Sequence, residues 1–306
     1  MILSSYEDYF FAFFYKQIFY ISARNTDSLK TRQNYFIKML KVNEQTVPYE
    51  EEIKVIDLVN SFKPGADLFI LNGYPVSPDT VVADGDICCL VKYGETPTAE
   101  EMESLLVARH TPGVHEIVQK ATVGIMGLGG LGSVVAGGLA RIGVGKLILA
   151  DFDMVEPSNL NRQQYSISQI GMRKTKALKE NLLLMNPYIV IETVDGRLTE
   201  ESIPAIFRSV DVLAECFDNP AMKAAALRAV LTFMIGTGYV GASGLAGYGD
   251  NNIIKTKKIH DHVYIIGDET SAAGPGHGLM APRVGIAAHH QANQILRILL
   301  RKINTD

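Results

Sequence analysis

A glycine-rich segment that joins an apolar run to a helical pattern constrains this chain more than any other feature. Its glycines are Gly127, Gly129, Gly130 and Gly132. Residues 121–126 before it are apolar and predict a strand, whereas residues 130–142 predict a helix. Glycines at such a junction allow a tight turn and a close approach of the backbone to a phosphate. The free N–H groups at the start of the helix favour an anion, so the segment predicts a nucleotide-binding turn.

Strand-like and helix-like patterns alternate beyond this turn, which favours a doubly wound, mainly parallel sheet. The expected strands are 146–150, 189–194, 211–216 and 236–242, and the expected helices are 172–185, 219–234 and 283–302. Residues 243–278 are rich in glycine and are expected to be irregular. The predicted fold class is therefore α/β, with a Rossmann-like sheet in a domain over residues 121–306.

The chain before this domain divides into three further parts. Residues 39–95 predict a small domain with the order strand, strand, helix, strand, strand. Residues 96–120 are expected to form a helical connector that starts at the capping pattern Thr98-Ala-Glu-Glu101. Residues 1–38 are dense in aromatic side chains and are interpreted as an extension without a folded role. An amphipathic helix at a membrane surface is the alternative interpretation of that extension.

Composition excludes several classes of protein. The net charge of −4 argues against a protein that coats nucleic acid, because such proteins are usually basic. Three cysteines, of which Cys88 and Cys89 are adjacent, supply neither a disulfide framework nor a four-cysteine zinc site. No apolar run reaches the roughly 20 residues that a membrane span needs. We therefore expect a soluble, cytoplasmic protein.

Polar residues follow the predicted strand ends and helix starts. Asp151 ends the second strand of the alternating region, Lys174 lies at a helix start, and Asp218 follows the strand at 211–216. Ligands of open α/β sheets bind at the carboxyl ends of the strands, so we expect these side chains and the glycine turn to meet in one crevice. The turn and Asp151 together indicate an adenine nucleotide with a ribose. They leave ATP and a nicotinamide dinucleotide equally open.

A family resemblance separates these two ligands. Residues 110–302 contain GLGGLGS, GVGKLILADFDMVEPSNLNRQ, IGMRKTKA and CFDN in this order, and they resemble the ThiF/MoeB/HesA group of ubiquitin-activating-enzyme-like adenylyltransferases. The segment Leu71-Asn-Gly-Tyr-Pro-Val76 and the following Asp84-Gly-Asp86 resemble the β-grasp fold of ThiS-like sulfur carriers. Such carriers end in a free Gly-Gly tail, whereas this chain continues past Gly94, so the domain is not itself a carrier.

The resemblance implies an activity and its partners. Members of the group adenylate the C-terminal glycine carboxylate of a small ubiquitin-like sulfur carrier with ATP, release pyrophosphate and act as homodimers. Thiamine thiazole biosynthesis is the expected pathway, and adenylation of the molybdopterin-synthase carrier is the nearest alternative. Three other interpretations stay open: an NAD-dependent oxidoreductase, a non-catalytic module whose fused domain covers the carrier surface, and an enzyme that acts on a tRNA-linked threonylcarbamoyl group. The acidic pI argues against the third.

The resemblance also assigns roles to individual residues. Asp151 is expected to hold the ribose, Arg162 and Lys174 to neutralise the phosphates, and Asp218 to bind Mg²⁺. The further expected ATP-binding residues are Asp153, Asn159 and Gln163, beside the four glycines named above. Arg109 is expected to reach the site of the partner subunit across a dimer. Asp218 and Asn219 are also candidates for capping the helix that follows them.

Two departures from the family pattern refine these expectations. Many relatives hold a structural zinc with two CxxC pairs, and this chain has none, so no zinc is expected. Some relatives use a cysteine in a mobile loop, whereas this chain has no cysteine after Cys216, which we interpret as a buried apolar residue. We therefore expect adenylation without a covalent cysteine step, and a separate sulfur donor. The loop 243–278 is expected to guide the carrier tail.

Overall fold

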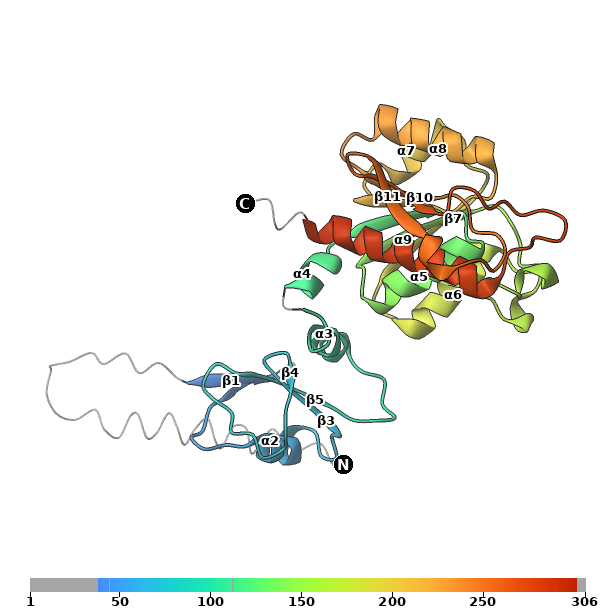
Figure 1. The fold of residues 1–306 in the computed structure, drawn as a ribbon. Coiled ribbons are helices and arrows are strands. Elements are labelled where there is room, and N and C mark those ends of the chain that lie inside the picture. The colour runs from blue at the N-terminus through green and yellow to red at the C-terminus, as the bar shows by residue number, and fades with distance from the viewer. Residues whose placement is uncertain (1–37, 44, 112, 302–306) are drawn as a thin grey trace, which may run out of the picture.

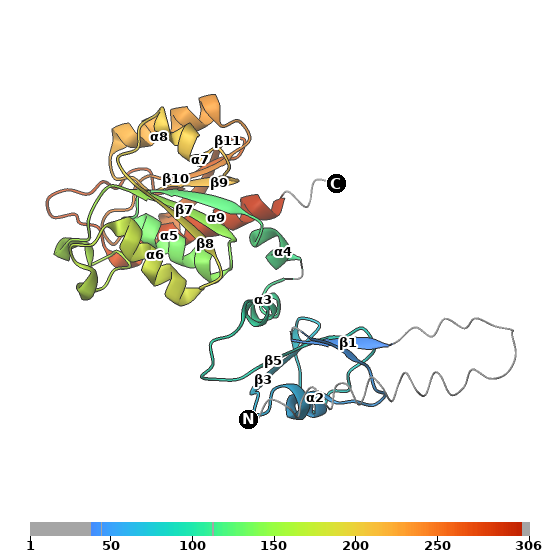
Figure 2. The same ribbon diagram turned by 180° about the vertical axis from the view of Figure 1, so that it is seen from behind.

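The computed structural model describes residues 38–43, 45–111 and 113–301. Within these ranges the chain forms a small N-terminal sheet and a larger C-terminal sheet, joined by two short helices (Figure 1). The interpretation of the aromatic N-terminal extension falls on residues 1–37, which lie outside the described part of the chain. In both views the two sheets belong to separate bodies (Figure 2).

The N-terminal sheet has the element order predicted for a β-grasp domain. Its elements are β1 (Met39–Val42), β2 (Gln45–Pro48), α2 (Val55–Phe62), β3 (Leu68–Leu71), β4 (Tyr74–Pro75) and β5 (Ile87–Val91). The strands lie in the order β2-β1-β5-β3-β4, with β5 parallel to β1 and antiparallel to β3. The two-residue strand β4 is the one element here that was not expected, because it is too short to show a sequence pattern.

Both faces of this sheet are covered, which explains the continuous apolar run of β5. Successive side chains of a strand point to opposite faces. Cys88 and Leu90 therefore pack in the cluster that contains α2. Cys89 and Val91 point the other way and pack against Leu105 of the connector helix α3 (Ala99–Val107). The connector thus forms part of the core of the small domain.

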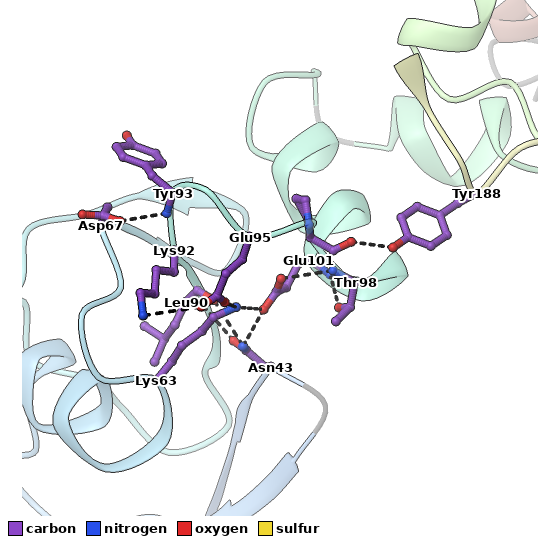
Figure 3. A network of polar contacts seen from close by, with 11 residues as sticks. Asn43, Lys63, Asp67, Leu90, Lys92, Tyr93, Glu95, Thr98, Glu101 and Tyr188 are labelled. Atoms are coloured by element: carbon purple, nitrogen blue, oxygen red, sulfur yellow. Dashed lines mark hydrogen bonds and ion pairs between the residues drawn. The ribbon is translucent and has the colours of Figure 1, made fainter. Parts of the chain in front are cut away.

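A buried carboxylate fastens α3 to the sheet (Figure 3). Thr98 caps α3, and Glu101 completes the predicted capping box by accepting the Thr98 N–H at 3.1 Å. Glu101 also accepts hydrogen bonds from Asn43 Nδ2 at 3.0 Å and from Lys63 Nζ at 2.5 Å. One further contact links the connector to the large domain, because the Tyr188 hydroxyl donates to the Pro97 carbonyl.

The C-terminal domain is a doubly wound α/β domain, which confirms the predicted fold class. Its strands are β6 (Thr122–Met126), β7 (Lys146–Asp151), β8 (Val190–Asp195), β9 (Val212–Glu215), β10 (Gly238–Ala242), β11 (Lys255–His260) and β12 (Val263–Gly267). Its helices are α5 (Gly130–Arg141), α6 (Lys174–Met185), α7 (Ser202–Phe207), α8 (Pro220–Phe233) and α9 (Ala281–Arg301), and α4 (Val114–Val118) leads into it. The strand order is β11-β12-β10-β9-β6-β7-β8, and every pairing except β11 with β12 is parallel.

Helices cover both faces of this sheet. α5, α6 and α9 pack on one face and α7 and α8 on the other, as both views show (Figures 1 and 2). The chain first adds strands from β6 through β7 to β8 and then returns to add β9 on the other side of β6. The strand order therefore reverses between β6 and β9, and a crevice is expected at the carboxyl ends of these strands. No helix of the described residues is long and apolar enough to cross a membrane.

The expectation of an irregular segment over residues 243–278 is wrong for its centre. Residues 255–267 form the hairpin of β11 and β12, and β12 is a buried strand of the main sheet. β11 is exposed along its whole length, so its lysine-rich sequence lacks the apolar pattern that predicts a strand. Gly267, the last residue of β12 with a φ of +139°, and the glycines on either side of the hairpin made the whole segment resemble a loop.

Candidate functional site

A cleft of about 830 Å³ lies where the glycine turn meets the carboxyl ends of β7, β9 and β10. Most of the predicted site residues line it: Gly127, Gly129, Gly130, Asp151, Asp153, Arg162, Gln163, Lys174 and Asp218. They come from five separate chain segments, so the fold brings together residues that lie far apart in the sequence. Gly132, Asn159 and Arg109 are predicted site residues that do not line the cleft.

The glycine turn is shaped by close backbone contacts. Gly127 has a φ of +87°, a conformation that other residues rarely adopt. A Cβ on Gly132 would lie 1.9 Å from the Gly127 carbonyl oxygen, so Gly132 packs the start of α5 onto the turn. Its contact with ATP remains a prediction. Gly129 precedes α5 without a side-chain cap. The first N–H groups of α5 therefore remain available to an anion in the cleft.

Asp151 holds the turn in place. Its Oδ2 accepts the Leu128 N–H at 2.6 Å and its Oδ1 accepts the Asp153 N–H at 2.8 Å. The side chain is buried at the end of β7 and lines the cleft. A carboxylate oxygen has two lone pairs, so each oxygen keeps the capacity for one more donor. The contact of Asp151 with a ribose remains a prediction. The structure shows in addition that Asp151 stabilises the glycine turn.

Lys174 and Asp153 form an ion pair beside Asp151. Lys174 Nζ lies 2.8 Å from Asp153 Oδ2, and the Lys174 N–H donates to the Asp153 carbonyl at 3.0 Å. Lys174 is the first residue of α6 and only 5% exposed. The pair fixes the ammonium group at the wall of the cleft, which is the placement that a phosphate-binding lysine requires.

A short 3₁₀ helix at Pro157–Asn159 presents the next two side chains. Asn159 Oδ1 accepts the Glu156 N–H at 3.0 Å, and the Asn159 carbonyl accepts the N–H groups of Arg162 and Gln163. Asn159 therefore shapes the turn from which Arg162 and Gln163 enter the cleft. Its direct contact with a phosphate remains a prediction. Gln163 is 7% exposed, and its Oε1 has no hydrogen-bond partner among the described residues.

Asp218 and Asn219 were both candidates for capping α8, and Asp218 was also the expected Mg²⁺ ligand. Asn219 caps α8, because its Oδ1 accepts the N–H groups of Ala221 and Met222 at 2.9 and 3.2 Å. Asp218 is exposed in the cleft and makes no hydrogen bond or ion pair with another described residue. One hard carboxylate of this kind, together with phosphate oxygens, is the ligand set that Mg²⁺ prefers. The described residues contain no group of three or more His, Cys, Asp or Glu side chains placed to hold a metal.

The structure also shows a cleft residue that sequence reasoning missed. Lys223 lines the cleft one turn into α8. Its Nζ lies 2.9 Å from Oε1 of the buried Glu215 and donates to the Ala242 carbonyl at 2.8 Å. Burial raises the pKa of Glu215, and the Lys223 charge opposes that rise. The spacing of Lys223 from Asn219, one helical turn, was the signal that could have located it at the strand ends.

Cys216 is buried, as predicted. It packs in the core between the sheet and α9, and burial raises its pKa far above the ordinary value for a thiol. Cys88 and Cys89 are also buried and unpaired. A thiol that stays protonated is a poor nucleophile, so none of the three is suited to a covalent step.

Arg109 lies outside the cleft within this chain. It follows α3 in the connector, where its backbone N–H donates to the Leu106 carbonyl, and its side chain is exposed. The residues that line the cleft all fall between Gly127 and Val284. The role of Arg109 across a dimer therefore remains a prediction about a second copy of the chain.

Comparisons with solved structures agree with this fold. A tRNA N6-threonylcarbamoyladenosine dehydratase of Escherichia coli, solved in complex with AMP, superposes with a TM-score of 0.61 at 18% identity and covers 69% of this chain and 100% of its own. The same enzyme in complex with ATP gives a TM-score of 0.61 at 19% identity, with 69% of this chain and 99% of its own covered.

Curated relatives match parts of the chain. The adenylyltransferase and sulfurtransferase UBA4 of Candida glabrata is 30% identical over 62% of this chain and 45% of its own length. The molybdopterin-synthase adenylyltransferase of Haemophilus influenzae is 43% identical over 32% of this chain and 41% of its own length. The chain thus spans less than half of the length of these relatives. A ThiS-like ubiquitin model matches residues 39–94, and since the ThiF family model matches residues 104–306, the chain belongs to the ThiF family.

Proposed function

We propose that this chain adenylates the C-terminal glycine carboxylate of a small ubiquitin-like sulfur carrier with ATP and releases pyrophosphate. The convergence of the glycine turn, Arg162, Lys174 and Asp218 in one cleft carries this proposal. Hydride transfer to or from NAD would leave the placement of Arg162, Lys174 and Asp218 in this cleft unexplained. The names of the relatives, which include adenylyltransferases, support the same reaction.

The cleft fits a nucleotide triphosphate. The start of α5 offers N–H groups to the phosphates, and Arg162 and Lys174 add positive charge. Gln163 Oε1, buried without a partner, provides an acceptor for a hydroxyl or amino group of the nucleotide. The superposed dehydratase binds AMP and ATP on the same fold, which supports this assignment.

The proposed reaction is a displacement at the α-phosphorus of ATP. A carboxylate oxygen of the carrier forms a bond to this phosphorus while the bond to the pyrophosphate oxygen breaks, and the negative charge passes to pyrophosphate. Arg162 and Lys174 stabilise that charge, and Asp218 would hold Mg²⁺, which neutralises phosphate oxygens when bound. No general base is required, because a C-terminal carboxyl group is already ionised near neutral pH. Catalysis then consists of positioning and charge stabilisation.

The carrier is proposed to be a separate protein with a Gly-Gly tail. The fused β-grasp domain continues into α3 and has no free carboxylate to activate. Its residues also do not line the cleft, which leaves the site open to a second protein. We further propose that the chain acts in the cytoplasm as a homodimer, that Arg109 enters the partner's site, and that sulfur comes from another protein.

Thiamine thiazole biosynthesis is the proposed pathway, supported by the ThiS-like ubiquitin match at residues 39–94. A molybdopterin-synthase carrier is the second candidate, favoured by the similarity to adenylyltransferases of that name. The two are separated by the carrier that supports ATP–pyrophosphate exchange. Purified ThiS-like and molybdopterin-synthase carriers are compared at equal concentration, with tail-truncated carriers as controls.

The same exchange assay tests the catalytic roles. Arg162→Ala and Asp218→Ala are expected to lower the exchange rate by about 100-fold or more, because each removes charge that stabilises the transition state. Lys176→Ala, a change in a lysine that does not line the cleft, is the control. Undiminished exchange in both site variants would refute the assigned roles. Thermal stabilisation by NAD, without stabilisation by ATP and Mg²⁺, would favour an oxidoreductase.

A further inference from the structure

Two loops form the side of the cleft that lies farthest from Asp151. Ser243–Ala246 follow β10 and Glu269–Ala273 follow β12, and both segments line the cleft. β10 is separated from β7 by β9 and β6, so the two sides lie about 14 Å apart at the usual strand spacing. The nucleotide-binding residues predicted above gather on the β7 side. These loops are therefore left for the other substrate.

A buried ion pair organises the two loops from behind. Asp268 Oδ2 lies 2.7 Å from Arg283 Nη2, and the two side chains are 6% and 4% exposed. Asp268 also accepts the N–H groups of Thr270 and Ser271 at 2.8 and 2.7 Å, and the Ser271 hydroxyl at 2.6 Å. These bonds outweigh the effect of burial and keep the pKa of Asp268 far below its ordinary value. The carboxylate thus defines the turn that starts the second loop.

Arg283 connects that turn to residues 249–250, which follow the first loop in the chain. It lies in the first turn of α9, and its Nη1 donates to the carbonyls of Gly249 and Asp250 at 2.9 and 3.1 Å. The planar guanidinium group therefore joins three segments that are distant in sequence. Neither Asp268 nor Arg283 lines the cleft, so both act through the loops.

The loops are also packed directly on each other. Gly244 has a φ of +80°, and a Cβ on it would lie 2.2 Å from Asp268 Oδ1. The Asp268 N–H donates to the Gly244 carbonyl and the Glu269 N–H donates to the Ser243 carbonyl, both at 3.0 Å. Only glycine fits this contact, so the carboxylate fixes the path of the first loop as well as the second.

We infer that Asp268 and Arg283 are positioning residues for the carrier tail. They hold the two loops between which the glycine carboxylate reaches the nucleotide, and they do not contribute to nucleotide binding. This inference rests on the proposed function. It places the determinant of tail binding behind the cleft, in a pair that contacts neither substrate.

The test separates the two substrates kinetically. Arg283→Met is expected to raise the KM for the carrier on the order of tenfold, because small displacements of a binding loop are costly. The KM for ATP, and the ATP affinity measured by calorimetry, are expected to change less than about twofold because the nucleotide side is untouched. Arg283→Lys keeps the charge without the planar guanidinium group, so its KM for the carrier is expected to lie between those of the unmodified protein and Arg283→Met.

A matched control is available on the surface. Arg228 forms an ion pair of the same length, 2.7 Å, with Glu200, but the pair is exposed on the outer helix α8. Arg228→Met is expected to leave both KM values unchanged. If Arg283→Met does not fold, Asp268→Asn supplies the same readout, since it removes the charge with little change in volume.

The outcomes are distinct. A selective rise in the carrier KM supports the inference. Equal changes in both KM values, an unchanged carrier KM in a folded variant, or failure of Asp268→Asn to fold would overturn it. If the unmodified protein shows no exchange with any carrier, the proposed function itself fails, whatever the variants do.

Discussion

Replacement of Glu101 by alanine tests whether the connector is part of the small domain. Glu101 is 3% exposed and accepts hydrogen bonds from Lys63, Asn43 and the capped end of α3. Burial lowers the pKa of Lys63, but the hydrogen bond to Glu101 and the negative charges of Glu101 and Glu95 together outweigh burial, so the pKa is raised. The ammonium group is therefore stabilised by this carboxylate and loses its main partner in the variant.

The magnitude follows from the surroundings of the ion pair. Removal of one partner of a buried ion pair destabilises a protein by about 3–5 kcal/mol. The Lys63 side chain keeps 19% exposure and a second carboxylate, Glu95, at 3.7 Å. We therefore expect the low end of the range, about 3 kcal/mol, which includes the loss of the capping box.

Hydrogen exchange measured by mass spectrometry locates this loss. Amides of β5 are expected to exchange about 100-fold faster in Glu101→Ala, whereas those of β6 in the large domain keep their rates. Glu100→Ala is the matched control, because Glu100 forms an exposed ion pair with Lys41 at 3.0 Å that is worth about 1 kcal/mol or less. Unchanged exchange of β5 in Glu101→Ala, or equal effects of the two substitutions, would refute the reasoning.

Three shorter predictions concern the large domain and its junction with the connector. Lys223→Met leaves the buried Glu215 carboxylate without its cation and is expected to lower the free energy of unfolding in urea by about 3 kcal/mol or more, with partial recovery in the double variant that also carries Glu215→Gln. Burial lowers the pKa values of His115 and His110 below the ordinary 6.5, so the unfolded chain binds protons that the folded chain does not. Stability is therefore expected to fall as the pH is lowered through the unfolded-state pKa of about 6.5, until the lower folded-state pKa values are reached, and His115→Gln is expected to flatten this dependence in thermal melts. Gly132→Ala places a Cβ 1.9 Å from a carbonyl oxygen of the turn and is expected to abolish the thermal stabilisation by ATP while Lys176→Ala retains it.

Local rules predicted most of the fold because the chain follows them closely. At the start of the large domain, the apolar run forms strand β6, Gly127 adopts a positive φ in the turn, and α5 starts without a side-chain cap. The sequence pattern of this segment predicts all three features. Thr98 and Glu101 form the capping box that their spacing predicts. The same spacing gives no sign that the Glu101 carboxylate also bridges to Lys63, since that contact depends on how the helix packs.

Tertiary packing decided the features that were missed. β12 is only five residues long and follows the exposed, lysine-rich β11, so its apolar residues alone did not predict a strand of the main sheet. Lys223 looked like an ordinary surface lysine on a helix, and only the fold places it against Glu215. Asn159 belongs to the same motif as Arg162 and Gln163 but does not line the cleft, and its Oδ1 accepts the Glu156 N–H within the 3₁₀ helix, a local contact that the motif alone did not reveal.

The exposed strand β11 has a consequence for how molecules of this protein meet. It is the outermost strand of the large sheet, and the edge strand of a sheet is the place at which a strand of another molecule can pair. Lys255, Lys257 and Lys258 lie along it. Lys257 and Lys258 form ion pairs with Glu269 and Asp261. A second strand that approached edge to edge would have to desolvate these charged groups, which opposes growth of the sheet into fibrils. Six residues that look unsuited to a strand thereby give the sheet a defined end.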